Sequence, residues 1–234
     1  MPELTLRRSD TELWLIDHPL RTLGAQLGTR TSVIRLADGC LWLISPGPGL
    51  ESLKAELEAL GPVSALVAPN AMHHLSLPAT LTLFPEATVY GPPGLKAKQP
   101  DLPYLPYAQA PWAAEIPRIE VQGLGGLEES AFYHRPSRSL LVTDLVFNIR
   151  RSQHLWTRLF MILNDGYGRF GPTRVLRSLL KDPEALRASL EAILAWDFER
   201  VVMAHGEVLE SDGRRQLQAA YARIGVLPAG PVPV

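Results

Sequence analysis

The sequence predicts an α/β fold, and three observations support that prediction. Short apolar runs rich in β-branched residues, which are typical of strands, alternate with segments whose apolar residues have helical spacing. Glycine and proline mark many of the junctions between them. The composition, 46% hydrophobic and 20% charged over 234 residues, provides enough apolar material for a sizeable core. We therefore expect a single domain over residues 1–234, with an irregular proline-rich excursion at about 92–117 and a mainly helical C-terminal part.

The first half of the chain opens on a predicted β-hairpin. Residues 31–36 (TSVIRL) and 40–45 (CLWLIS) are β-prone runs joined by a turn sequence. After a PGPG turn, residues 50–61 (LESLKAELEALG) have leucines at helical spacing and a terminal glycine as the stop. Residues 64–69 (SALVAP) and 88–94 (TVYGPPG) are further predicted strands that run into prolines. In the proline-rich excursion, tyrosines and Trp112 indicate packing on the core rather than a linker.

The second half begins with three more predicted strands and ends with helices. The strands are residues 118–123 (RIEVQG), 129–134 (ESAFYH) and 139–144 (SLLVTD), the last two joined as a hairpin. Residues 182–197 begin with Asp-Pro-Glu, which is typical of a helix N-terminus, and have one leucine-rich face. A last buried strand at 200–206 (RVVMAHG) and a closing helix at 212–224 complete the pattern.

The balance of charge argues against polyanionic partners. The net charge of −1, from 23 basic and 24 acidic residues, provides no global field for nucleic acid or an anionic membrane. We expect a small-molecule substrate, and the sequence does not indicate the oligomeric state. One stretch is locally basic, which is typical of a solvated face but leaves a small anionic substrate as an alternative; its residues are Arg150, Arg151, Arg158, Arg169, Arg174 and Arg177.

The single cysteine and the absence of long apolar segments indicate the cellular compartment of the protein. Cys40 lies in an apolar run, which indicates a buried, inert thiol rather than a disulfide or a thiolate metal ligand. No segment has the ~20 apolar residues of a membrane span, and the N-terminus lacks a signal-peptide pattern. We expect a cytoplasmic protein.

Four metal-ligand side chains lie at or just beyond the ends of predicted strands. His73 and His74 follow the strand at 64–69, Asp144 ends the strand at 139–144, and His205 ends the last strand. Such strand ends commonly carry binding groups, because loops there expose side chains that a rigid sheet holds in place. Three imidazoles and one carboxylate suit Zn²⁺, and also Fe²⁺ or Mn²⁺. Taken singly, Asp144 also fits a turn cap and His205 a packed core histidine.

The order of these motifs resembles the metallo-β-lactamase superfamily, and more narrowly an uncharacterised bacterial family marked by PN-x-x-HH. The resemblance spans roughly residues 12–210, and the motifs that carry it are LWLISPGPG, VAPNAMHH, SAFYHRPSRSLLVTDLVF and VVMAHG. The resemblance implies a four-layer αββα sandwich.

The chain departs from the superfamily's H-x-H-x-D-H motif. With the last histidine of the motif on His74, Pro69 and Ala71 occupy the positions of the first two histidines and His73 that of the aspartate. The mid-chain histidine would fall near Gly125. By this resemblance every exclusive ligand of the first metal is lost.

The ligand residues that this chain retains from the superfamily pattern correspond to a single-metal site. The second metal's ligands His74, Asp144 and His205 remain, and His73 is a ligand-capable replacement for the motif's aspartate. The implied cofactor is one divalent ion, zinc in the first instance, with iron or manganese as alternatives.

The resemblance implies a metal-dependent hydrolase of an ester, thioester or phosphoester. Glu129 is the candidate general base or additional ligand, with a solvated strand-end carboxylate as the alternative, and Asn70 would orient a water or hold its loop. His134, on the opposite strand face from Glu129, is expected to make a structural hydrogen bond. The alternative functions are a non-catalytic or binding protein with a structural metal or none, and redox chemistry at iron.

Overall fold

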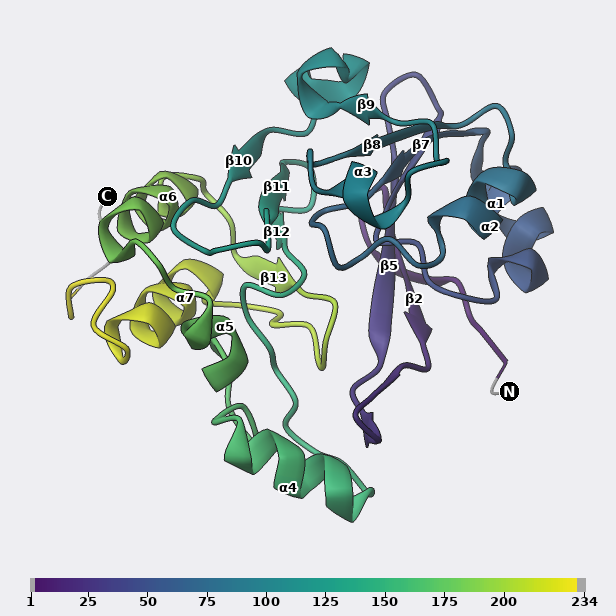
Figure 1. Ribbon diagram of the computed structural model, residues 1–234. Helices are drawn as coiled ribbons and strands as arrows, with labels where there is room; N and C mark the ends of the chain where they lie inside the picture. Colours follow the sequence, from purple (N-terminus) through teal and green to yellow (C-terminus); the bar gives the residue numbers. More distant parts are fainter. Residues whose placement is uncertain (1–2, 231–234) are drawn as a thin grey trace. The chain divides into compact units, whose positions relative to one another are not determined.

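The computed structural model describes residues 3–230, which divide into two compact units (Figure 1). The first unit comprises the chain up to Pro19 together with Thr29–Glu115. The second comprises Leu20–Gly28 together with the chain from Ile116 onward. The single domain expected over residues 1–234 stays a prediction.

The first unit is built on a seven-stranded sheet of order β1-β2-β5-β6-β7-β8-β9. Neighbouring strands from β1 to β6 are antiparallel, and those from β6 to β9 are parallel. The strands are β1 Arg7–Asp10, β2 Leu13–His18, β5 Thr29–Arg35, β6 Leu41–Ile44, β7 Val63–Val67, β8 Thr88–Gly91 and β9 Leu105–Pro106. The predicted hairpin is confirmed as β5 and β6, and the predicted strands at 64–69 and 88–94 as β7 and β8.

Short helices connect the strands of the first unit. They are the 3₁₀ helix η1 Leu50–Leu53, α1 Lys54–Leu60, α2 Leu77–Leu83, α3 Leu95–Lys98, η2 Tyr107–Gln109 and η3 Pro111–Ala114. The helix predicted over 50–61 is confirmed as η1 followed by α1, and Gly61 ends it. Gly61 has a φ of 156°, and a Cβ there would lie 2.1 Å from the carbonyl oxygen of Gly39, so only glycine fits.

The proline-rich excursion packs on the first unit, as its aromatic residues predicted. Trp112 is buried and meets Trp42 and Tyr90 edge to face, at ring-centroid distances of 5.4 and 5.5 Å. The hydroxyl of Tyr107 donates a hydrogen bond to the carbonyl oxygen of Ala68. Aromatic burial therefore fixes a segment whose regular structure consists of short elements, namely α3, β9, η2 and η3. Cys40, by contrast, is only partly buried, so the prediction of a buried thiol was wrong.

The second unit contains a four-stranded sheet of order β10-β11-β12-β13. β12 is antiparallel to β11 and parallel to β13, and β3 and β4 form a separate two-stranded hairpin. The strands are β3 Arg21–Thr22, β4 Ala25–Gln26, β10 Arg118–Glu120, β11 Ser130–His134, β12 Ser139–Leu141 and β13 Arg200–Val202, and the helices are α4 Leu155–Leu163, α5 Arg174–Ser178, α6 Pro183–Leu194 and α7 Gly213–Ala222. The strands and the two long helices expected in this half are confirmed.

Local sequence signals explain where α6 begins and how it packs. The Asp182 carboxylate accepts hydrogen bonds from the amides of Glu184 and Ala185, each at 3.0 Å, and so caps the helix. Leu190 and Ile193, on one face of α6, are fully buried in the core that also holds Tyr221 of α7. These contacts anchor the helical C-terminal part to the sheet.

The helix α4 has an apolar outer face. Inward, the Thr157 hydroxyl accepts a hydrogen bond from the amide of Gln26 in β4 at 2.8 Å, and Met161 is buried. Outward, five apolar side chains are exposed: Leu155, Trp156, Leu159, Ile162 and Leu163. Across residues 3–230, α4 included, none of the helices has both the length and the apolarity that crossing a bilayer requires.

Candidate functional site

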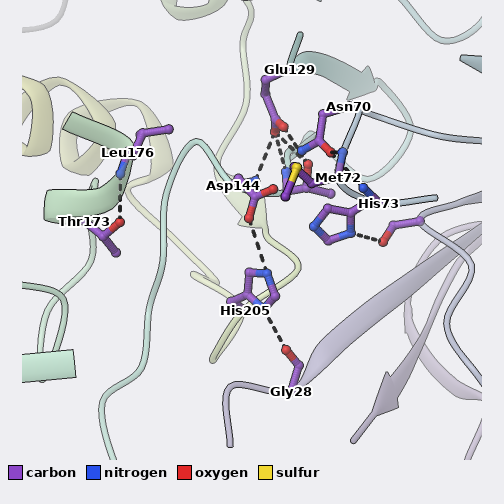
Figure 2. Close-up of polar contacts among 11 residues, drawn as sticks. Gly28, Asn70, Met72, His73, Glu129, Asp144, Thr173, Leu176 and His205 are labelled. Carbon is purple, nitrogen blue, oxygen red and sulfur yellow. Dashed lines mark hydrogen bonds and ion pairs between the residues drawn. The ribbon is translucent and has the colours of Figure 1, made fainter. Parts of the chain in front are cut away.

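Asn70 organises the loop that follows β7 and carries the two histidines. Its side-chain oxygen accepts hydrogen bonds from the amides of Met72 and His73, at 2.7 and 2.9 Å (Figure 2). Asn70 is fully buried, so this turn is held from inside the protein. Of the two roles predicted for Asn70, holding the loop is confirmed.

His73 and His74 are neighbours in sequence but have different partners. Nδ1 of His73 lies 2.7 Å from the hydroxyl oxygen of Ser45, which follows β6 in a left-handed conformation with a φ of 54°. Nδ1 of His74 lies 2.9 Å from the side-chain amide nitrogen of Gln99, just after α3. Desolvation, followed by the positive charges of Lys98 and His73, lowers the pKa of His74 and favours its neutral form.

Glu129 is a buried carboxylate that binds the chain at Asp144. It accepts hydrogen bonds from the Thr143 amide at 2.7 Å, the Thr143 hydroxyl at 2.7 and 2.8 Å, and the Asp144 amide at 3.2 Å. Glu129 is 0% exposed, so the alternative of a solvated strand-end carboxylate was wrong. The alternation of side chains along the strand predicted at 129–134 did not reveal that the Glu129 carboxylate points inward, toward the backbone that follows β12.

Asp144 and His205 lie together in the second unit. Nε2 of His205 is 3.4 Å from a carboxylate oxygen of Asp144, and Nδ1 is 2.6 Å from the carbonyl oxygen of Gly28 (Figure 2). The imidazole stacks on Phe147, with ring centroids 4.7 Å apart. His205 is 5% exposed, so packing and hydrogen bonding together fix the ring.

This arrangement determines which nitrogen of His205 can bind a metal. A carbonyl oxygen only accepts hydrogen bonds, so Nδ1 of His205 carries the proton that the short contact to Gly28 requires. Nε2 is then directed at the Asp144 carboxylate. An imidazole whose second nitrogen donates to a backbone carbonyl, beside a carboxylate, is the usual arrangement of a metal-binding histidine. The donor set of the second unit therefore fits a divalent metal.

Close packing also fixes the backbone beside His205. Gly206 has a φ of 96°, and a Cβ there would lie 2.3 Å from the carbonyl oxygen of Asn148. The Asn148 amide donates to the carbonyl oxygen of His205 at 3.1 Å, and the Glu207 amide donates to the carbonyl oxygen of Asn148 at 2.9 Å. The glycine after the predicted ligand is thus required by the close approach of two backbone segments.

Within each unit, the structure brings predicted residues together. Asn70 holds the backbone of His73 in the first unit, and Glu129 holds that of Asp144 beside His205 in the second. The full set of four metal ligands stays a prediction. The sequence did not reveal the residues that contact these side chains, which are Ser45, Gln99, Thr143, Gly28 and Phe147. Ser45, Thr143 and Phe147 lie in the motifs LWLISPGPG and SAFYHRPSRSLLVTDLVF, which could have indicated them, whereas Gln99 and Gly28 lie in neither. His134 makes the structural hydrogen bond expected of it, with Nδ1 2.7 Å from the Ser137 hydroxyl.

Solved structures similar to this chain are metallo-β-lactamases and a flavodiiron core. The metallo-β-lactamase FIM-1 from Pseudomonas aeruginosa, in its mono-zinc form, is 11% identical with a TM-score of 0.63, covering 96% of this chain and 97% of that one. A metallo-β-lactamase from Pontibacter korlensis is 13% identical with a TM-score of 0.63, covering 97% and 100%. The metal-soaked Flv1 flavodiiron core from Synechocystis sp. PCC6803 is 13% identical with a TM-score of 0.65, covering 94% of this chain and 60% of that one.

These matches confirm the predicted fold class, an α/β fold of the metallo-β-lactamase type, and at such low identity they bear on the fold alone. No curated protein matches the chain. The sequence profile described as "Domain of unknown function (DUF4336)" matches residues 10–157, which is more than half of the chain. The protein is therefore a member of the DUF4336 family, with the fold of the metallo-β-lactamases.

Proposed function

We propose that this protein is a metal-dependent hydrolase with a reduced, single-metal site. The observation that carries the proposal is the Asp144–His205 pair, in which hydrogen bonding to Gly28 leaves Nε2 of His205 directed at the carboxylate. The fold of the similar structures agrees with it, since they include metallo-β-lactamases and FIM-1 among them is in its mono-zinc form. His73 and His74 would complete the ligand set.

Zinc is the proposed ion, because neutral imidazoles with one carboxylate are ligands that it prefers. Iron and manganese accept the same donors and stay as alternatives. The lowered pKa of His74 favours the neutral imidazole that metal binding needs. When the side-chain amide of Gln99 donates to Nδ1 of His74, the proton of the neutral imidazole is on Nε2 of His74. Nε2 of His74 could then bind the ion only after the Gln99 amide rotates and the proton moves to Nδ1.

The surrounding residues would fix the ligands in place. When bound, the ion would polarise the substrate carbonyl or phosphoryl oxygen and lower the pKa of a water. Glu129 would hold the backbone of Asp144, and Asn70 that of His73, through the hydrogen bonds described above. The occupied oxygens of Glu129 favour this positioning role over that of general base.

The proposed substrate is a small-molecule ester, thioester or phosphoester. A net charge of −1 provides no global attraction to nucleic acid or an anionic membrane. The proposal also places the protein in the cytoplasm, since a chain with one cysteine has no disulfide framework that would need an oxidising compartment.

Metal analysis of three matched variants tests the proposal. Purified wild-type protein should contain, or take up on titration, about one equivalent of divalent metal per chain. His205→Gln and Asp144→Asn should lose that metal. His154→Gln is the control, because His154 is a partly buried histidine of the same unit that caps α4 through Thr157. Unchanged metal uptake by the His205 variant would refute the single-metal site.

Hydrolase and non-catalytic functions give different results in the same preparation. A hydrolase should cleave model esters, thioesters or phosphoesters, and the rate should rise with metal occupancy. Metal retained without any such cleavage would favour a structural metal in a binding protein. Elemental analysis of protein produced in iron-rich and in zinc-rich media would distinguish iron chemistry from zinc chemistry.

A further inference from the structure

The second unit has a cavity lined by arginines. Its volume is about 490 Å³, and its lining includes Arg150, Arg169, Arg215 and Arg223 with Phe170 and Ala219. Two of these arginines belong to the helix α7 or its end, and the other two come from the segments flanking α4. Four guanidinium groups from three stretches of chain thus surround one space.

The helix α7 forms one wall of this cavity through its periodicity. Arg215, Ala219 and Arg223 follow one another at intervals of four residues and therefore lie along one helix face. The small side chain of Ala219 leaves space between the two arginines. One amino group of Arg223 donates to the carbonyl oxygen of Phe170 at 2.7 Å. This hydrogen bond links α7 to the opposite wall, which is the loop that carries Arg169.

The positive charge of the lining is only partly neutralised. Arg169 pairs with Asp165, and Arg215 pairs with Asp212 at 2.5 Å, in an exposed contact that water screens. No carboxylate of residues 3–230 forms an ion pair with Arg150 or Arg223. Nε of Arg150 donates a hydrogen bond to the side-chain oxygen of Asn148 at 3.0 Å.

These guanidinium groups repel one another. Desolvation lowers the pKa of Arg223, the positive charge of Arg169 lowers it further, and Asp165 offsets part of the effect. Like charges held together in this way cost free energy that an anion would recover. The planar guanidinium donates two parallel hydrogen bonds to phosphate or carboxylate oxygens, so several arginines can share one multivalent anion.

We propose that this cavity binds a phosphorylated small molecule, with Arg150 and Arg223 as its principal contacts. The volume falls in the range of about 300–1,000 Å³ typical of small-molecule sites, which exceeds what a single phosphate needs. A phosphate group presents three oxygens to donors that converge from different walls, whereas a carboxylate presents two. This inference goes beyond the proposed hydrolase and does not depend on it.

Calorimetric titration with inorganic pyrophosphate tests this site, with ionic strength matched by sodium chloride. Wild-type protein should bind pyrophosphate saturably, and Arg150→Gln and Arg223→Gln should each weaken the affinity at least about tenfold, as loss of a charge-assisted hydrogen bond does. Arg174→Gln is the matched control, because it removes one exposed positive charge of the same unit outside the cavity lining. The Arg223→Gln variant loses the hydrogen bond to Phe170 and could fail to fold. In that case the Arg150→Gln variant alone tests the site.

Further outcomes would overturn the proposal. Absence of saturable binding at millimolar pyrophosphate, or equal weakening by Arg174→Gln, would show that the cavity is no specific site. Citrate binding as tightly as pyrophosphate would contradict the preference for phosphate. Asp144→Ala should bind pyrophosphate as wild type does, and loss of binding there would assign the anion to the proposed metal centre instead.

Discussion

Replacement of Glu129 should destabilise the protein more than replacement of any exposed carboxylate. Its side chain is fully buried and satisfies two backbone amides, those of Thr143 and Asp144, as well as the Thr143 hydroxyl. Glu129→Ala removes the acceptor for all three donors, whereas Glu129→Gln keeps one oxygen in nearly the same volume. The two variants therefore separate loss of the hydrogen bonds from loss of the charge.

The magnitude follows from the orphaned donors. A buried donor that loses its partner costs about 1–3 kcal/mol, so the two amides together should cost about 2–6 kcal/mol in Glu129→Ala. Glu129→Gln should cost about 1–2 kcal/mol, since hydrogen bonds to a charged acceptor exceed those to a neutral one by roughly that amount.

Urea unfolding measured by circular dichroism gives these free energies. The matched control is Glu120→Gln in β10, because Glu120 belongs to the same sheet but is exposed and pairs with Arg118 only at 3.8 Å. The control should lose less than about 1 kcal/mol. If the proposed metal site exists, Glu129→Ala should also weaken metal affinity by about 10–100-fold, as loss of a residue that orients a ligand does.

One result would refute the reasoning about Glu129. If Glu129→Ala unfolds at the same urea concentration as Glu120→Gln with an unchanged slope, the buried hydrogen bonds contribute nothing to stability. A combined Thr143→Val and Glu129→Gln protein gives a further check. The two changes should be less than additive, because Thr143→Val removes the hydroxyl contact that Glu129→Gln weakens.

Three further outcomes are expected elsewhere in the chain. Burial lowers the pKa of His18, so the unfolded state takes up a proton near pH 6.5 more readily than the folded state does. The free energy of unfolding should therefore fall as the pH drops from about 7.5 to about 5.5. Urea unfolding of His18→Gln should show a smaller fall. Leu190→Ala, at a fully buried position, should cost about 2–5 kcal/mol, and Leu159→Ala, 47% exposed, should lose under half as much in the same assay. Gly206→Ala should cost several kcal/mol, because its Cβ would overlap the carbonyl oxygen of Asn148, and an unchanged thermal midpoint would contradict that close approach.

Signals within a few residues of one another predicted much of the fold. The helix α6 is an example, because its cap, its N-terminal proline and its leucine face all lie within the segment that folds. The hairpin of β5 and β6 is another, since apolar alternation and a short turn indicate it locally. The helix α4 was not predicted, because most of its apolar residues face outward and its polar Thr157 faces inward, the reverse of the pattern expected for a helix that packs on a core.

For the candidate site, the sequence by itself indicated the candidate ligands and predicted their positions at or just beyond strand ends. His73, His74, Asp144 and His205 could be named from motif order alone. Only the tertiary structure decided how each is held, because the partners are distant in sequence. Gly28 meets His205 across 177 residues, and no local pattern encodes such a contact. The same holds for Glu129, whose buried carboxylate is satisfied by Thr143 and Asp144 from the segment that follows β12.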